Sequence, residues 1–258
     1  MPETALQHFR EDIGRARAII QHADPLPRAT PEEAMLRSDL LRSAWMFAVG
    51  AIDAYFSDAY ADIVAATALS KQRQPSIVLP RSIQEIKVPI RAVLETYDAR
   101  DWRWRMAARA MVDSTSFLSL ESIRKSFNPF FRKGHKLFGD KLADWIQHPA
   151  AKIRLFGMSA NDYSALGDAG KDKAMKNTVT SQFTERYEDI FQRRHDCIHN
   201  CDRPRLSPQR LTGAATVERV VQDAVFLVER CDDHIAAEFR EFLLGCGCPS
   251  NIIAQSGY

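Results

Sequence analysis

The chain has 258 residues, of which 45% are hydrophobic and 26% charged, a balance typical of folded, water-soluble proteins. Its 35 Lys and Arg against 33 Asp and Glu leave a formal net charge of +2, so attraction to a polyanion must come from local clusters of basic residues. No uncharged apolar run approaches about 20 residues, and we therefore expect no membrane span.

The opening residues Met1 to Thr4 are acidic rather than basic and apolar, so no signal peptide is expected. Five cysteines are an odd number, and nothing suggests export. We therefore expect a cytoplasmic, reduced protein with free thiols.

The N-terminal third predicts two helices. Apolar residues recur on one side over residues 4–21, and a second helix is expected from residue 31 to about 69. Thr30 suits the N-cap and Glu33 follows three residues later, the spacing of a capping box. The centre of this helix, Ala44 to Ile52, is apolar all round and is expected to be buried on all sides. Asp53 follows directly, and a charge there is costly unless it is paired.

The rest of the chain also predicts helices, which we list in order: 81–97 with a break or kink at Pro89, 103–112, 116–127, 137–147, a regular stretch from Lys171 to the Arg193–Asn200 region, and 215–244. Residues 157–170 are expected to form a loop with a short helical turn, and 246–258 a loosely held tail. Neither an internal repeat nor a convincing strand pattern occurs. The predicted fold is an all-α bundle with long antiparallel helices.

Residues 100–136 are locally basic, with nine Lys and Arg against three acids and with Trp and Phe between them. Basic side chains hold phosphates and aromatic faces stack on unpaired bases, which favours RNA contact. The alternative is that the aromatic residues form core and the arginines surround it. The candidate RNA-binding residues are Arg124, Lys125, Arg132, Lys133 and Lys136.

The stretch Arg193 to Asn200 has the residue types that cleave a phosphodiester without a metal. Arginine is a permanent cation with donors that fit phosphate oxygens, and histidine exchanges a proton near neutral pH. Cations also favour the C-terminal end of a helix for purely structural reasons. Arg193, Cys197 and Cys201 are expected to be structural.

His195 and His199 are four residues apart, which is also the spacing of a metal-binding pair. The metalloprotease pattern is absent because no Glu follows His195. Candidates for a third ligand are Asp196, Asp202, Cys246 and Cys248. We expect no metal and no cofactor. A nucleophilic Cys197 or Cys201 would need a base and an activating cation, and buried structural cysteines are the commoner explanation.

The run Arg194-His195-Asp196-Cys197-Ile198-His199 resembles the signature of the HEPN superfamily: an arginine, a polar residue, three variable residues and a histidine. The small-residue-rich helix with Asp53 resembles that family's early helix. The nearest branch is the one called RiboL-PSP-HEPN. On this resemblance, residues 1–245 form one domain with a core at about 33–68 and 172–244 and a helical insertion at about 75–170, followed by the tail 246–258.

The resemblance implies a metal-independent endoribonuclease whose Arg and His motifs, from two protomers of a homodimer, form one site. Arg194 would hold the phosphate and His199 would transfer a proton, while His195 and Asn200 would assist. Asp53 would orient Arg194 or His199. The resemblance leaves the setting open: a toxin–antitoxin pair, phage defence with an antitoxin or defence-system partner, or housekeeping. The alternatives are a non-catalytic RNA- or nucleotide-binding module, and a structural or regulatory dimer.

Overall fold

The computed structural model describes residues 2–94, 102–113, 115–200, 202 and 210–255. Every regular element in these ranges is a helix, and no strand occurs among them. The prediction of an all-α protein is therefore confirmed.

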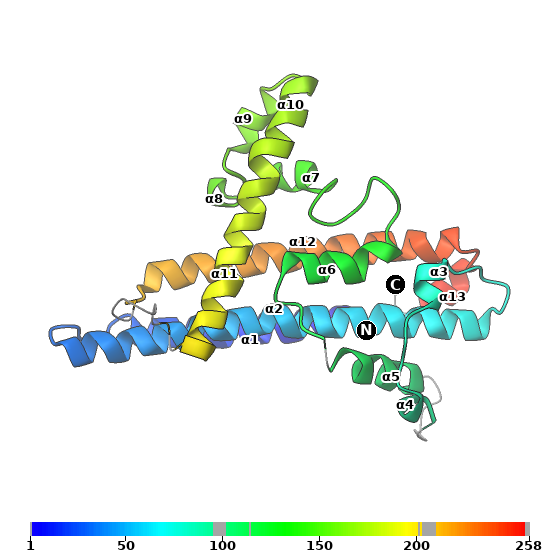
Figure 1. Cartoon of the computed structure of the whole chain (residues 1–258), viewed down its shortest axis with the longest axis horizontal. Coiled ribbons are helices and arrows are strands. Elements are labelled where there is room, and N and C mark those ends of the chain that lie inside the picture. The colour runs from blue at the N-terminus through cyan, green and yellow to red at the C-terminus, as the bar shows by residue number, and fades with distance from the viewer. Residues whose placement is uncertain (1, 95–101, 114, 201, 203–209, 256–258) are drawn as a thin grey trace.

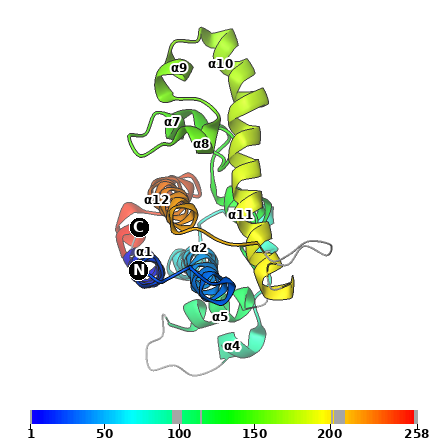
Figure 2. The ribbon, with the colours of Figure 1, turned by 90° about the vertical axis from the view of Figure 1, so that its left-hand side faces the viewer.

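Three long helices form the body of the molecule: α1 (Pro2–Ala23), α2 (Pro31–Arg73) and α12 (Ala214–Gly245). They contact one another and lie together when viewed end-on (Figure 2). The start of α2 is as predicted: the Glu33 amide donates to Thr30 Oγ1 at 3.2 Å, and the Thr30 amide donates to the Glu33 carboxylate at 3.1 Å.

The long helices are not all antiparallel. Residues 24–30 turn the chain back between α1 and α2, whereas α2 and α12 run in the same direction (Figure 1). A short connection forces neighbouring helices to be antiparallel. Residues 74–213 separate α2 from α12, so the connection does not fix the direction of α12.

The remaining described helices are shorter: α3 (Arg81–Gln84), α4 (Ile90–Leu94), α5 (Trp102–Val112), α6 (Leu120–Phe127), the 3₁₀ turn η1 (Asn128–Phe130), α7 (Leu142–Ile146), α8 (Ile153–Phe156), α9 (Ala160–Ser164), α10 (Asp168–Ala174), the π-helical turn η2 (Met175–Val179), α11 (Thr180–Asn200) and α13 (Ser250–Gln255).

Two of the expected helices are interrupted. The stretch 81–97 is divided into α3 and α4 around Pro89, and its last residues lie outside the described ranges. The expected helix at 137–147 is reduced to α7. Phe138 has a φ of 57°, a left-handed conformation that no right-handed helix contains. The apolar residues of this stretch therefore pack without forming a continuous helix.

The elements α7 to α10 and the first half of α11 form a lobe that stands away from the long helices (Figures 1 and 2). Its core is aromatic: Phe183 lies 5.6 Å from Phe156 and 6.0 Å from Trp145 between ring centroids. Phe226 of α12 packs edge-on against Phe156 at 5.8 Å. The lobe is thus attached to the long helices through α12.

The centre of α2 lies in the main core, where Ala44, Trp45, Ala48 and Ile52 are buried. The expectation of burial on all sides is wrong at Phe47, which is 40% exposed. The guanidinium of Arg15 lies over this ring at 5.1 Å. A cation on the solvent side reduces the cost of exposing the aromatic face.

The C-terminal segment is not loosely held over residues 246–255. α13 packs on α2 and α12, and Ile253 and Cys248 are buried. The amide of Cys248 donates to the carbonyl of Leu243 at 2.9 Å, which closes the end of α12. Residues 256–258 lie outside the described ranges.

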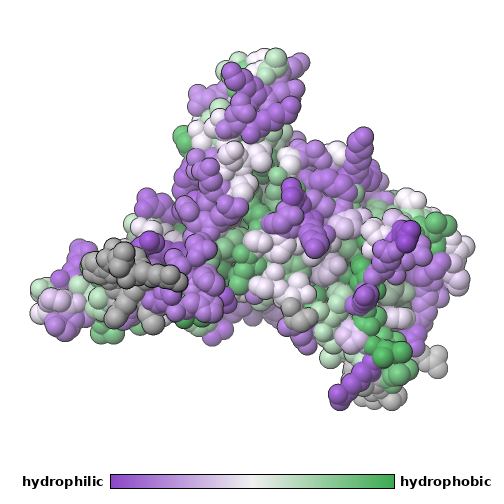
Figure 3. Space-filling view, in the orientation of Figure 1, coloured by the Kyte–Doolittle hydropathy of each residue, from purple (hydrophilic) through white to green (hydrophobic). Residues whose placement is uncertain are grey.

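None of the described helices is long and apolar enough to cross a membrane. The face shown in Figure 3 is mainly hydrophilic along α11 and the upper lobe, and apolar side chains gather near α4 and α5. Two arginines of α5 pair with acids of α2: Arg105 lies 3.1 Å from Asp62, and Arg109 lies 2.7 Å from Asp58. α5 is therefore bound to the main bundle by ion pairs.

Candidate active site

α11 crosses α2 and α12 steeply and carries the Arg and His motif on its last two turns (Figure 1). Two buried hydrogen bonds fix it there. The Tyr187 hydroxyl donates to the Asp223 carbonyl on α12 at 2.7 Å, and the Trp45 indole donates to the Ile190 carbonyl at 3.2 Å. Burial raises the pKa of Tyr187 well above its usual value, which keeps its hydroxyl protonated as a donor.

Arg193 is part of this structural framework. Its Nη2 donates to Asp202 Oδ2 at 2.9 Å and to Thr212 Oγ1 at 2.7 Å, and its guanidinium lies 4.7 Å from the Trp45 ring. These contacts pair the cation with a carboxylate and an aromatic face at the junction of α11 with α2. The expectation that Arg193 is structural agrees with these contacts.

Asp202 is the centre of a buried ionic cluster that the sequence indicated only as a zinc-ligand candidate. Its side chain is 1% exposed, and besides Arg193 it lies 3.7 Å from Arg42 Nη1. Its amide donates to the Asp196 carbonyl at 3.1 Å, and its φ of 55° is left-handed, a region that Asp tolerates better than most residues. The cluster thereby ties the end of α11 to α2.

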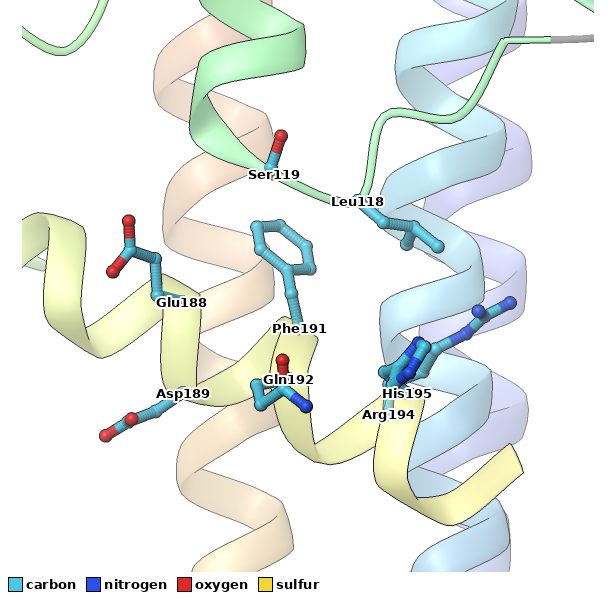
Figure 4. A pocket seen from close by; sticks show the side chains of 8 residues that line it. All are labelled: Leu118, Ser119, Glu188, Asp189, Phe191, Gln192, Arg194 and His195. Carbon is cyan, nitrogen blue, oxygen red and sulfur yellow. The ribbon is translucent and has the colours of Figure 1, made fainter. Parts of the chain in front are cut away.

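Arg194, the neighbour of Arg193, lines a pocket instead. The pocket has a volume of about 530 Å³, within the range of ligand-binding cavities, and lies between the last turns of α11 and the segment Leu118–Ser119 before α6 (Figure 4). Within the described part of the chain, the Arg194 guanidinium has no hydrogen-bond or ion-pair partner. It is therefore available to an anion in this pocket.

The two histidines of the motif stack on one face of α11. The centroids of the His195 and His199 rings are 4.3 Å apart, and both residues are exposed. His195 lines the pocket beside Arg194, and His199 lies one turn further along. Asn200 is exposed at the end of the helix. The structure therefore brings Arg194 and His195 together, with His199 stacked on His195.

Asp53 is not brought to this group. Its Oδ1 accepts a hydrogen bond from the Phe117 amide at 2.6 Å, and it lines a different pocket, with Arg109 and Asp113. Among the described residues, Asp53 has no hydrogen bond or ion pair with Arg194 or His199, so the expectation that it orients one of them has no contact to support it. A buried backbone N–H needs an acceptor, and Asp53 supplies one where the chain enters the segment before α6.

The five candidate RNA-binding residues divide by their partners. Arg132 donates to Glu238 at 2.9 and 3.0 Å, and Arg124 pairs with Glu121. Lys136 donates to the Asn128 carbonyl at 2.6 Å, and burial lowers its pKa. Lys125 and Lys133 are exposed, with no hydrogen bond or ion pair to the residues that the structure describes. Only these two cations of the five are free within those ranges.

The alternatives based on metal or thiol chemistry find no geometric support. Among the described residues, no three His, Cys, Asp or Glu side chains are grouped to hold a metal ion. Cys246 and Cys248 lie at the other end of the bundle from the motif (Figure 1). Burial raises the pKa of Cys197 to about 11, which leaves almost no thiolate at neutral pH. Cys201 lies outside the described residues.

Three features position the motif: the aromatic face of α11, the capped start of α2 and the buried ionic cluster at Asp202. The pocket adds residues that sequence reasoning missed, Leu118, Ser119, Glu188 and Gln192. The spacing of Glu188, Gln192, His195 and His199, at four, three and four residues, was the available signal for one shared face. No family model, curated protein or solved structure matches the chain.

Proposed function

We propose that this protein is a metal-independent endoribonuclease and that Arg194 and His199 are its principal catalytic residues. The observation that carries the proposal is the contrast between two adjacent arginines. Arg193 is paired with Asp202 and Thr212, whereas Arg194 lines an open pocket beside two stacked histidines. A free cation beside two proton carriers suits a phosphodiester under attack.

RNA supplies its own nucleophile in this reaction. A histidine takes the proton of the 2′-hydroxyl as the bond from O2′ to phosphorus forms. The bond from phosphorus to O5′ breaks, and a second histidine protonates the leaving oxygen. Arg194 stabilises the charge that builds on the non-bridging oxygens. The products are a 2′,3′-cyclic phosphate and a 5′-hydroxyl end.

Two copies of the chain complete the proposed site. His199 serves one proton transfer and the second copy's His199 serves the other, while His195 and Asn200 assist in binding and orientation. The exposed apolar side chains near the motif support such an interface: Ile198 is 47% exposed and Leu211 is 62% exposed. A two-fold axis next to α11 would place both motifs around one cleft.

The test is the cleavage of labelled RNA by EDTA-treated protein, with the chemical identity of the product ends determined. His199→Ala should reduce the rate by about 10²- to 10⁴-fold and Arg194→Ala by about 10²- to 10³-fold. The matched controls are His22→Ala on α1 and Arg219→Ala on α12, both exposed and outside the pocket. Absence of cleavage, or equal rates in wild type and His199→Ala, would disprove the proposal.

The dimeric site has its own test. Adding excess His199→Ala protein to wild type should lower the activity per wild-type chain, because most wild-type chains then pair with an inactive copy. If each chain carries an independent site, the activity per wild-type chain stays constant.

A further inference from the structure

The pocket at Arg194 has two chemically different ends. Arg194 and His195 lie at one end, and the carboxylate of Glu188 lies at the other (Figure 4). Glu188 and Arg194 are six positions apart on α11, a distance of about 9 Å along the helix axis. Among the described residues, neither side chain has a hydrogen-bond or ion-pair partner. The pocket thus offers an anion site at one end. At the other end, Glu188 is a negatively charged acceptor for a neighbouring group of the same ligand.

The carboxylate end is unsuited to phosphate. Glu188 is exposed and would repel a phosphate bound near it. The nucleotide group that matches a carboxylate is a base edge carrying N–H donors. Leu118 and Phe191, which line the pocket between its ends, supply apolar surface for the plane of such a base (Figure 4).

Gln192 narrows the choice of base. Its Nε2 donates to Asp196 Oδ1 at 2.9 Å, and because a carboxylate only accepts, the amide nitrogen must face Asp196. The Gln192 carbonyl oxygen therefore remains as an acceptor, one helical turn from Glu188 on the same face. Glu188 and Gln192 thus place two acceptors one helical turn apart along α11, both lining the pocket (Figure 4).

Only guanine, among the four RNA bases, carries two adjacent N–H donors on its Watson–Crick edge, at N1 and at the exocyclic amino group. Adenine and cytosine place an acceptor next to their amino group, and uracil has one N–H between two carbonyls. Unpaired bases are commonly read on this edge. We propose that Glu188 and Gln192 bind a guanine adjacent to the phosphate held by Arg194, which gives the site a guanine preference. This inference rests on the proposed function for its phosphate and extends it to substrate specificity.

The experiment separates base recognition from cleavage. Fluorescent hexanucleotides with 2′-fluoro riboses lack the nucleophile, so their affinity can be measured by anisotropy without cleavage. Each carries one guanine, inosine or adenine in a uridine background. Wild type should bind the guanine oligonucleotide about tenfold more tightly than the adenine one, since a hydrogen bond to a charged group gives discrimination of this order. Inosine, which keeps N1–H and lacks the amino group, should fall between them.

Glu188→Ala should abolish this preference, and Glu188→Gln should reduce it severalfold because the charge is lost while one acceptor remains. Glu185→Gln is the matched control: it removes the same charge from an exposed residue of α11 that does not line the pocket. Equal binding of guanine and adenine by wild type, or a preference that survives Glu188→Ala, would overturn the inference. The cleavage assay with EDTA-treated protein decides the proposed function separately, because a guanine preference can persist in a protein that cuts nothing.

Discussion

Replacing Asp202 by Asn should destabilise the protein and detach the end of α11 that carries the motif. Asp202 is 1% exposed and has Arg193 Nη2 at 2.9 Å and Arg42 Nη1 at 3.7 Å. Asn is the appropriate substitution because it has the same shape and also tolerates the left-handed backbone of φ 55°. The change therefore removes charge while altering little else.

The size of the stability loss depends on the partners that Arg42 and Arg193 retain in the variant. Removing one partner of a buried ion pair costs about 3–5 kcal/mol. Arg42 retains Asp39 and the Arg210 carbonyl, and Arg193 retains Thr212. The expected loss is therefore at the lower end, about 3 kcal/mol, which lowers Tm by about 6–12 °C for a chain of this size.

Urea unfolding followed by circular dichroism measures this loss. The control is Glu121→Gln, which breaks the exposed pair between Glu121 and Arg124 and should cost about 0–1 kcal/mol. A loss in Asp202→Asn no larger than in this control would refute the view that the cluster fixes the end of α11. RNA cleavage should also fall in Asp202→Asn at temperatures where the variant remains folded, because Arg194 and His199 are carried by the same turns.

Three further outcomes are expected. Burial raises the pKa of Asp62 from 3.8 to about 6 in the folded protein, despite Arg105 at 3.1 Å. Between about pH 4 and pH 6 the unfolded chain therefore loses this proton first, and stability decreases as pH rises. In urea unfolding, wild type should lose about 3 kcal/mol of stability relative to Asp62→Asn as the pH rises from about 4 to 6; a difference that does not change with pH would contradict this. Asp53→Asn, which weakens the bond to the Phe117 amide, should cost about 1 kcal/mol and leave the cleavage rate unchanged, whereas a large fall in rate would return Asp53 to the site. Cys197, with a pKa of about 11, should react with iodoacetamide at pH 8 far more slowly than free cysteine when its peptide is followed by mass spectrometry, and equal rates would show an exposed thiolate.

Local signals in the sequence were sufficient for the long helices. The start of α2 depends on Thr30 and Glu33, which are three residues apart, and the face of α11 depends on a regular apolar spacing. These interactions are contained within a few turns of chain, so they are visible without the fold. The break at Pro89 was also predicted, because proline disrupts a helix, and α3 and α4 lie on either side of it. The interruption at Phe138 was not predicted, because its left-handed backbone depends on packing against distant segments.

The site required contacts between distant residues. Asp53 accepts a hydrogen bond from the amide of Phe117, 64 positions away. The sequence does not indicate which backbone amide will need a side-chain acceptor. The ionic cluster joins Arg42 to Asp202 and Arg210, and the pocket joins α11 to Leu118 and Ser119. No periodicity specifies such pairs. The sequence therefore could not show that Arg124 and Arg132 are paired with carboxylates and that Lys136 donates to backbone carbonyls.

Arg193 and Arg194 are identical in composition and adjacent in sequence, and only the fold distinguishes them. Successive residues on a helix point about 100° apart, so one of two neighbours can face the bundle while the other faces the pocket. Asp202 and Thr212 accept hydrogen bonds from Arg193 and so anchor the end of α11. Because the helix end is anchored, Arg194 loses less conformational entropy when it binds a phosphate. The paired arginine and the unpaired one thus have complementary roles. If the carboxylate paired with Arg194 instead of Arg193, the net charge of the motif would be the same. The anion site in the pocket would nevertheless be lost.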